Sequence, residues 1–416
     1  MNDENKGIAM DEVSEKDNLS GTLPEKDIAN TIDSNVESES KDGTISAENS
    51  DSISTSKENE TPIFVKSNCS LSLYEIVPNL YDEVKKAIIQ KALGREQKLK
   101  EWFSAHRVED LPWAWEEQTR TGNKIIIDDG KEPKDIWYIG DLHGDILALE
   151  SAISYIQKQN SAAHIVFLGD VIDRQEFGFE VATKILELTI NNPGKILWIA
   201  GNHDIGLKYD SASDKFVSAV EPAEFSHWLN KKTNFSDFGR LFIDVVQRLP
   251  RAMFMQDGLC VIHGGVPGKE QIININAIGD LSSNIALDAY TFNRINPEKP
   301  RARGRELGWE NVKLFCDKAS QLLGFPVKRL LRGHDHCEKD RHLFYEQYKD
   351  NPVLTFVTLT TWTPDELFFK NLYKCINTSL IVAHHRENHL PEIIDISIPR
   401  ELIESFYGKS SFDEQI

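Results

Sequence analysis

The stretch Ile136-Trp-Tyr-Ile-Gly-Asp141-Leu-His143-Gly-Asp145 decides the fold. Four apolar residues are followed at once by a glycine and then by polar residues. Short apolar runs of this kind are typical of buried strands that deliver side chains to the edge of a sheet. The pattern recurs four times along the chain, in His164-Ile-Val-Phe-Leu-Gly-Asp170-Val-Ile-Asp173-Arg174, Ile196-Leu-Trp-Ile-Ala-Gly-Asn202-His203-Asp204, Leu259-Cys-Val-Ile-His263-Gly-Gly265 and Leu330-Leu-Arg-Gly-His334-Asp-His336.

The polar residues at the ends of these runs are of the types that bind metal ions. They are Asp141, His143, Asp170, Asn202, His263 and His334. Carboxylate, imidazole and amide ligands without thiolates suit hard or borderline divalent metals, and two such ions can clamp a phosphoryl group. The pattern therefore predicts a two-metal phosphoesterase.

The spacing of these residues indicates how they would divide between two ions. Asp141 and His143 are one residue apart, so both can face the same side where a strand unravels. The carboxylate of Asp170, at the end of the next run, could bridge two ions. Asn202, His263 and His334 would complete the coordination of the second ion.

Bulk composition excludes several classes of protein. The net charge is -19, and residues 1–60 hold 16 Asp or Glu against 5 Lys. This balance lacks the basic surface expected of a nucleic-acid-binding protein. Five cysteines without paired spacing fit a reducing compartment, and no run approaches 18 apolar residues. We expect a cytoplasmic protein that binds no membrane, although its acidic leader is also compatible with delivery by a specialised secretion system.

The chain divides into four regions by composition. Residues 1–62 lack Phe, Tyr and Trp and are predicted to be a disordered acidic tail, whose partner is unknown. Residues 63–135 are predicted to form a helical and irregular cap on the core, with helical spacing from Leu71 to Phe103. Residues 136–400 would form the catalytic domain and 401–416 a C-terminal tail.

Within the catalytic region, strands alternate with helical patterns. Helices are predicted over 146–157 and 180–191, each following a metal-binding run, which is typical of an α/β fold. From Val353 to Ile398 the pattern becomes rich in β-branched residues. We expect these last strands to form a closing antiparallel set that belongs to a second sheet.

Taken in order, the five motifs resemble a known family. Gly-Asp-Leu-His-Gly, Gly-Asp-Val-Ile-Asp-Arg, Gly-Asn-His-Asp, His-Gly-Gly and Arg-Gly-His resemble the PPP-type metal-dependent protein phosphatases, within the calcineurin-like metallophosphoesterases. The resemblance runs from about Ile136 to Ile398. It implies a four-layer α/β/β/α sandwich with two mixed β-sheets and two metals above the strand ends.

The resemblance also implies roles for single residues. Asp141, His143 and Asp170 would hold one ion, and Asp170, Asn202, His263 and His334 the other. A hydroxide bridging the ions would attack phosphorus in line. His203 matches the family's general acid and Asp173 the carboxylate that orients it, while Arg174 would bind phosphate oxygens.

Several positions stay open or depart from the family pattern. A second phosphate-binding arginine is expected at Arg303, with Arg305 and then Arg301 as rivals. His336 is either a ligand of the first metal or a polar residue at the rim. Asp145 and Asp204 stand where protein phosphatases of this type usually have Gln and Glu. Thr360-Thr-Trp362 occupies the stretch that normally carries a tyrosine.

The sequence thus predicts an enzyme that hydrolyses phosphomonoesters, with phosphoserine or phosphothreonine in proteins or peptides as the preferred substrates. The alternative is a small-molecule or dinucleoside polyphosphate hydrolase of the same superfamily. The expected cofactors are two divalent ions, manganese first, with iron or zinc as alternatives.

Overall fold

Two six-stranded sheets carry the runs that the sequence singles out. The computed structural model describes residues 64–68, 81–131, 135–296, 305–336, 342–344, 348, 350–362 and 375–409. The first sheet has the strand order β1-β18-β17-β3-β4-β5. Its strands are β1 (Phe64–Asn68), β18 (Glu392–Ser397), β17 (Ser379–Arg386), β3 (Asp135–Ile139), β4 (His164–Phe167) and β5 (Ile196–Trp198). β3, β4 and β5 run parallel, and β17 is antiparallel to β3.

The second sheet has the order β13-β14-β12-β9-β8-β2. Its strands are β13 (His342–Phe344), β14 (Val353–Phe356), β12 (Arg329–Arg332), β9 (Leu259–Ile262), β8 (Ala252–Phe254) and β2 (Ile125–Ile127). β12 lies between β14 and β9 and is parallel to both. Both sheets therefore contain a block of parallel strands, whose carboxyl ends point to a common edge within each block.

Alternating side chains pack the two sheets against each other. On β17, Leu380 and Val382 belong to the apolar cluster on the outer face of the first sheet, whereas Ile381 belongs to the cluster between the sheets. Tyr138 of β3 and Val261 of β9 meet in that same inner cluster. Because successive side chains on a strand face opposite sides, each sheet is buried on both faces.

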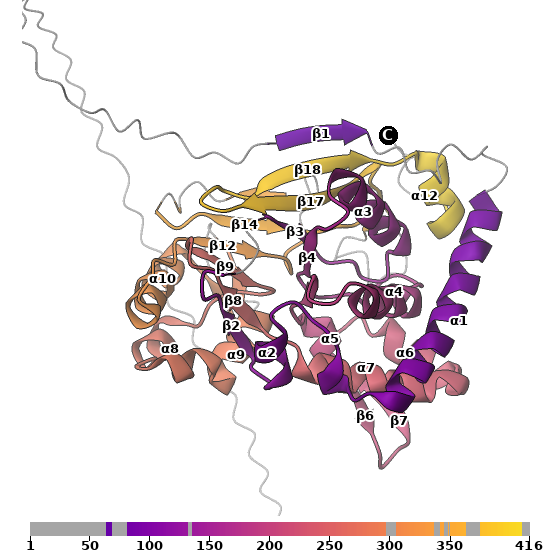
Figure 1. The fold of residues 1–416 in the computed structure, drawn as a ribbon, viewed down its shortest axis with the longest axis horizontal. Helices are drawn as coiled ribbons and strands as arrows, with labels where there is room; N and C mark the ends of the chain where they lie inside the picture. The colour runs from indigo at the N-terminus through magenta and orange to yellow at the C-terminus, as the bar shows by residue number, and fades with distance from the viewer. Residues whose placement is uncertain are drawn as a thin grey trace, which may run out of the picture. The chain divides into compact units, whose positions relative to one another are not determined.

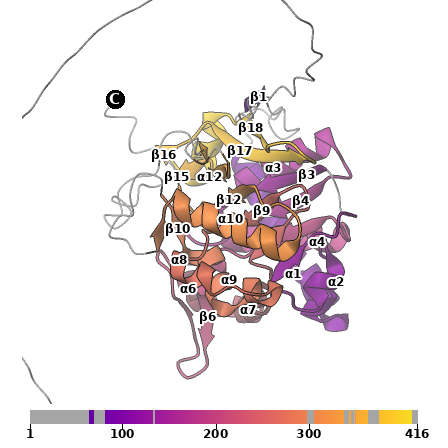
Figure 2. The ribbon, with the colours of Figure 1, turned by 90° about the vertical axis from the view of Figure 1, so that its left-hand side faces the viewer.

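Helices cover the two outer faces, which completes four layers (Figure 1). The helices on the first sheet are α1 (Tyr81–Ala105), α3 (Ile146–Gln159), α4 (Gly178–Asn191), α7 (Ser236–Arg248) and α12 (Arg400–Tyr407). Those on the second sheet are α8 (Lys269–Ile273), α9 (Asn284–Phe292) and α10 (Trp309–Leu323). Figure 2 shows α10 in front of β9 and β12. The predicted α/β/β/α sandwich with two mixed sheets is confirmed.

Shorter elements connect these layers. They are η2 (Val108–Asp110), α2 (Glu116–Arg120), α5 (Asn202–Gly206), β6 (Leu207–Asp210), β7 (Lys215–Ser218), α6 (Glu224–Lys231), η3 (Thr233–Phe235), η4 (Ile278–Ser282), β10 (Arg294–Ile295), β11 (Glu306–Leu307), β15 (Thr361–Trp362) and β16 (Cys375–Ile376). β6 and β7 form an antiparallel hairpin, and β10 pairs in parallel with β11.

The two helices predicted after the first motifs are confirmed as α3 and α4. The expectation for 353–398 is wrong, because these strands do not form one antiparallel set in the second sheet. β14 pairs in parallel with β12 in the second sheet, whereas β17 and β18 complete the first. The apolar, β-branched runs predict buried strands, and they carry no information about which sheet receives each strand.

Two regions outside the catalytic core also differ in detail from the expectation. The predicted cap over 63–135 supplies the long helix α1, but also β1 and β2, which extend the two sheets. The predicted tail over 401–416 begins with α12, whose Phe406 and Tyr407 are buried. The predicted acidic tail over 1–62 lies outside the described residues, as do residues 410–416. Among the described helices, none has the length and apolar character that crossing a bilayer requires.

Candidate metal centre

All six predicted metal ligands follow the carboxyl end of a strand. Asp141 and His143 follow β3, Asp170 follows β4, and Asn202 begins α5 just after β5. From the second sheet, His263 follows β9 and His334 follows β12. None of the six is more than 6% exposed. Residues from the strand ends of both sheets are thus buried together, at the place where α/β folds commonly bind ligands.

The ligand atoms of these residues lie in three groups, and within each group all atoms are within 4.8 Å of one another. The groups are Asp141 with His143 and His336, His143 with Asp170 and His203, and Asp170 with His263 and His334. Asp170 belongs to two groups. Asn202 adds its Oδ1 at 3.0 Å from Nε2 of His263. The described residues therefore provide clusters that fit a dinuclear metal site with one shared carboxylate.

The imidazole nitrogens have the orientation that a cation requires. Nδ1 of His143 donates to the carbonyl of Ile172, and Nδ1 of His263 donates to that of Leu168, both at 2.9 Å. In the neutral ring of His143 this leaves a lone pair on Nε2, and His263 offers the same lone pair once its ring loses its proton, as is usual for metal-binding histidines. These lone pairs face other ring nitrogens at 3.2 Å, Nε2 of His336 and Nδ1 of His334. Such converging acceptors fit a divalent cation between them.

Burial and charge set the protonation of the cluster. Burial lowers the pKa of His143, His334 and His336, so these rings are neutral at pH 7 and can offer lone pairs. Burial also opposes the charged form of His263, but Asp170 and Asp141 outweigh it and raise its pKa to about 9. For Asp170, the raising effect of burial is outweighed by His263 and His203, which hold its pKa well below the usual range.

His203 and Asp173 form a buried pair beside the cluster. Nδ1 of His203 donates to Oδ2 of Asp173 at 2.8 Å, and the backbone N–H of His203 donates to Oδ1 of Asp170 at 2.9 Å. The second oxygen of Asp173 accepts the backbone N–H of Phe225 at 2.9 Å. Burial lowers the pKa of His203, but Asp170 and Asp173 outweigh it and raise the pKa. The pair is thus held in a single orientation, with a ring that tends to keep its proton.

The backbone bends sharply where it presents these groups. Nine non-glycine residues of the described chain have a positive φ, and five are predicted site residues: His143, Asp170, Asp173, Arg174 and His334, with φ from 42° to 71°. Such conformations are costly for residues with a Cβ and cluster at functional sites. Gly201 and Gly333 allow close approach, since a Cβ there would lie 2.1 Å and 2.0 Å from the carboxylates of Asp170 and Asp141.

The predicted phosphate-binding arginines differ in where the structure places them relative to the ligand cluster. The charge of Arg174 is, after burial, the largest cause that lowers the pKa of His336, so Arg174 lies near the cluster. Arg303 and Arg301 lie outside the described residues. Arg305 is brought to the surface rather than to the cluster, because its Nη1 pairs with Oδ2 of Asp288 at 2.8 Å.

Arg294 lies at the cluster although the sequence analysis did not single it out. Its Nη1 contacts Asp335 and lies 3.4 Å from the carbonyl of His334, and its charge, after burial, lowers the pKa of His334. Asp335 is also held by the fully buried Arg332 at 2.6 Å. A lone arginine in a short strand gives no sequence signal. Its partner Asp335, between two candidate histidines, was the available hint.

Two aspartates that depart from the family pattern hold the site together. Asp204 accepts the backbone N–H groups of Asp170, Val171 and Gly201 at 2.9–3.0 Å. Asp145 caps α3 through the N–H of Ala148 at 2.9 Å. It also accepts from Thr360 at 2.6 Å and from the hydroxyl of Tyr407 at 2.7 Å. Both carboxylates therefore position the loops that carry the candidate ligands, and neither belongs to a group of ligand atoms.

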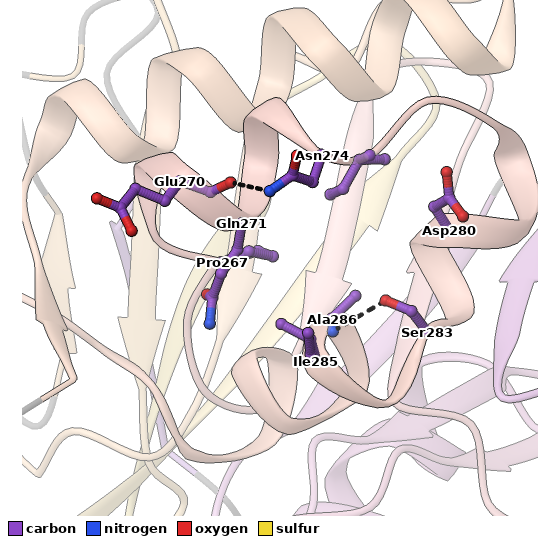
Figure 3. Close-up of a pocket in the computed structure, with 9 residues that line it drawn as sticks. Pro267, Glu270, Gln271, Asn274, Asp280, Ser283, Ile285 and Ala286 are labelled. Carbon is purple, nitrogen blue, oxygen red and sulfur yellow. Dashed lines mark hydrogen bonds between the residues drawn. The ribbon is translucent and has the colours of Figure 1, made fainter.

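A separate pocket of about 360 Å³ lies between α8, η4 and α9 (Figure 3). Its polar side chains serve local structure. Nδ2 of Asn274 donates to the carbonyl of Glu270 at 2.9 Å, and Ser283 accepts the N–H of Ala286 at 3.3 Å. The pocket shares no residue with the three ligand groups, so it is not the metal centre.

The family of the domain follows from comparison with known proteins. Residues 134–338 match the model of the calcineurin-like phosphoesterase family, and the matched span contains all five motifs. This chain therefore contains a calcineurin-like phosphoesterase domain, and it is distantly homologous to the PPP-family serine/threonine phosphatases.

Three similar proteins show how low the sequence identity to these phosphatases is. The serine/threonine-protein phosphatase PP2A-like PPG1 of Candida albicans is 24% identical over 262 residues, which cover 60% of this chain and 56% of that protein. The serine/threonine-protein phosphatase rdgC of Drosophila melanogaster is 28% identical over 140 residues, 33% of this chain and 20% of its own length. A Saccharomyces cerevisiae protein serine/threonine phosphatase with similarity to human phosphatase PP5 has a TM-score of 0.46 at 15% identity, covering 79% and 94% of the two chains. The chain thus spans little more than half of the first of these relatives.

We predict that Asp204→Asn weakens metal binding although Asp204 is not a candidate ligand. The amide offers one acceptor oxygen where the carboxylate offers two, so the backbone of Asp170 loses support. Loss of such a supporting contact typically lowers metal affinity by about 10- to 100-fold. Calorimetric titration with Mn²⁺ would measure it. Asp237→Asn is the control because Asp237 is 82% exposed. Equal affinities of the two variants would contradict the prediction.

Proposed function

We propose that this chain hydrolyses phosphomonoesters, with phosphoserine and phosphothreonine in proteins or peptides as the substrate class. The observation that carries the proposal is that Asp170 belongs to two groups of ligand atoms, one with His143 and His203 and one with His263 and His334, while His203 also pairs with Asp173. A dinuclear site next to a buried acid is suited to phosphoryl transfer, where charge stabilisation and protonation of the leaving group limit the rate. The distant serine/threonine phosphatase relatives support the choice of substrate.

The proposed metal ligands divide between two cations as the family resemblance implies. Asp141, His143 and Asp170 would hold one ion, and Asp170, Asn202, His263 and His334 the other. His336 joins the first set, because its Nε2 lies 3.1 Å from Oδ2 of Asp141 and 3.2 Å from Nε2 of His143. When bound, two divalent ions supply positive charge to the phosphoryl oxygens and make water acidic enough to act as a nucleophile. Manganese is the proposed metal, with iron or zinc as alternatives.

His203 is the proposed general acid. The hydrogen bond from its Nδ1 to Asp173 fixes the ring, so that Nε2 can carry the second proton toward a leaving oxygen. The two carboxylates that raise its pKa keep the ring protonated until the ester bond breaks. Asp173 would then stabilise the orientation of the ring and would not itself exchange the proton.

Arginines at the rim would bind the phosphate oxygens. Arg174 follows Asp173 directly, and Arg294 lies on the short strand β10 beside His334. A guanidinium offers two parallel donors to a phosphate, which gives both charge and orientation. Arg303 remains a proposed contact from the sequence, and Arg294 is the additional candidate that the structure supplies.

The motif around His334 and His336 supports a second candidate class of substrate. The Gly-His-Asp-His ending, with His336 drawn into the first ligand group, resembles the wider metallophosphoesterases more than the protein phosphatases. That resemblance favours a small-molecule or dinucleoside polyphosphate hydrolase as the second candidate.

Replacing His203 should separate acid catalysis from metal binding. We expect His203→Asn to lower kcat by about 10²- to 10⁴-fold on a phosphoserine peptide, whose alkoxide leaving group needs a proton. The loss should be smaller with p-nitrophenyl phosphate, whose leaving group is stable without one. Metal content should be retained in this variant, whereas Asp170→Asn should lose metal because both ligand groups share that carboxylate. Wild-type rates in both variants would refute the assigned roles.

Replacing Arg294 should weaken productive substrate binding. A hydrogen bond to a charged group contributes about 1.5–3 kcal/mol, so Arg294→Ala should lower kcat/KM by about 10- to 100-fold. Arg332 remains to hold Asp335, which limits structural damage. Arg305→Ala is the matched control, because Arg305 pairs with a surface carboxylate and should behave as wild type. An unchanged kcat/KM in Arg294→Ala would remove Arg294 from the proposed site.

A direct competition decides between the substrate classes. Purified protein with Mn²⁺ would be assayed for phosphate release from a library of phosphoserine, phosphothreonine and phosphotyrosine peptides, and separately for hydrolysis of diadenosine tetraphosphate. The proposal predicts faster turnover of phosphoserine or phosphothreonine peptides. Turnover of the dinucleotide alone would reject it in favour of the small-molecule hydrolase.

A further inference from the structure

A second pocket lies on the outer helical layer, away from every residue of the candidate metal centre. Its volume is about 480 Å³, within the range of small-molecule sites. Helix α1 lines it with Lys91, Gly94, Arg95 and Lys98. These positions are three, four and seven residues apart, so they share one face of the helix. α1 packs against α4 and α12 (Figure 1).

The facing helices contribute one further cation and two carboxylates. Glu150 comes from α3, and Lys184 and Glu187 from α4. Lys184 pairs with Glu150 at 3.3 Å, and Lys98 pairs with Glu187 at 3.6 Å. Counted with the residues of α1, four positive groups line the pocket against two negative ones. This excess of two positive charges lies in a chain whose net charge is -19.

Arg95 is the most deeply buried cation of the pocket, and one of its donors lacks an acceptor in the described part of the chain. Its side chain is 4% exposed, with Nε 3.1 Å from Oε2 of Glu187 and Nη2 3.0 Å from Oε1 of Glu150. Its Nη1 is buried and has no hydrogen-bond partner among the described residues. A buried donor on a charged group without an acceptor is unfavourable, so the native state gains from any anion that reaches it.

Gly94 gives the pocket its open floor. It lies in the interior of the 25-residue helix α1, where glycine weakens a helix relative to alanine. A Cβ at this position would meet nothing within 4 Å, so packing does not require glycine there. The missing side chain leaves space directly beside Arg95.

We infer that this pocket binds the phosphate group of a small molecule, at a site distinct from the metal centre and independent of the proposed activity. A phosphate monoester carries about two negative charges at pH 7, which balances the charge excess of the pocket. Its oxygens can accept from the ammonium groups of Lys91 and Lys98, while the positive charge of Arg95 lies in the wall of the same pocket. The shared chemistry is the phosphate dianion, whether free or attached to a nucleoside.

The test compares two substitutions at one position in the full, metal-loaded protein. Gly94→Glu places a carboxylate in the pocket, whereas Gly94→Ala adds a methyl group into open space. Equilibrium dialysis with radiolabelled inorganic phosphate should find one binding event at this pocket in the wild type and in Gly94→Ala. Gly94→Glu should weaken that event at least 10-fold. Equal binding by Gly94→Glu and Gly94→Ala would overturn the inference.

Phosphate that binds at the metal centre is separated by two readouts. Phosphate binding at the metal centre should persist in Gly94→Glu, and so should the rate of p-nitrophenyl phosphate hydrolysis. If the proposed function is wrong, it is the binding event and the activity at the metal centre that are missing, and binding at the outer pocket is unaffected. Thermal unfolding verifies that both variants are folded. If Gly94→Glu does not fold, the double substitution Lys91→Ala with Lys98→Ala is used, since Lys98 is 73% exposed and Lys91 is exposed. It should weaken binding at least 10-fold, and unchanged binding would overturn the inference.

The source of the phosphate follows from competition at this pocket. If adenosine monophosphate displaces labelled phosphate at a lower concentration than unlabelled phosphate does, a nucleotide ligand is supported. Adenosine is the control that lacks the phosphate group. Displacement by inorganic phosphate alone supports the free ion. Displacement by adenosine as strongly as by the monophosphate would overturn a site built around the phosphate group.

Discussion

The structure depends on one buried carboxylate, that of Asp170. It is 2% exposed and lies 3.5 Å from Nε2 of His143, which follows the first sheet, and 3.4 Å from Nε2 of His263, which follows the second. An ionised carboxylate removed from water is costly unless positive charge and hydrogen bonds compensate for it. Asp170 therefore forces the strand ends of two sheets to converge, because the groups that stabilise it come from both.

That convergence explains the conformation of the surrounding backbone. The loops turn within two to four residues of each strand end, where His143, Asp170 and His334 have a positive φ. Backbone of this kind persists only when the surroundings hold it in place. Asp204 does so for the Asp170 loop through three backbone N–H groups, and Asp145 ties the His143 loop to the C-terminal helix through Tyr407. The candidate site is thus rigid because carboxylates outside it satisfy the backbone that presents it.

The candidate ligands could be predicted from the sequence, whereas the residues that position them could not. Asp141, Asp170 and His263 were recognisable because each follows an apolar run, and the family resemblance of the motifs implied both sheets. The support from Tyr407 to Asp145 spans 262 residues and has no local signal. Arg294 was missed for the same reason, since only the folded chain brings it to Asp335. Periodicity reports the environment of a residue, but the partner that lies across a sheet is decided by topology.

The charge distribution indicates how an acidic chain can act on anions. With a net charge of -19, the chain as a whole repels a phosphate ester. At physiological ionic strength, exposed charges more than about 8 Å away are largely screened, so the groups nearest to the ligand decide binding. At the candidate centre these are Arg174 and Arg294, and at the outer pocket they are Arg95 and its neighbouring lysines. Arg95 is buried and Arg174 and Arg294 are partly buried, which strengthens their local field, whereas many acidic residues in the described part of the chain are exposed. The overall acidity therefore does not argue against an anionic substrate.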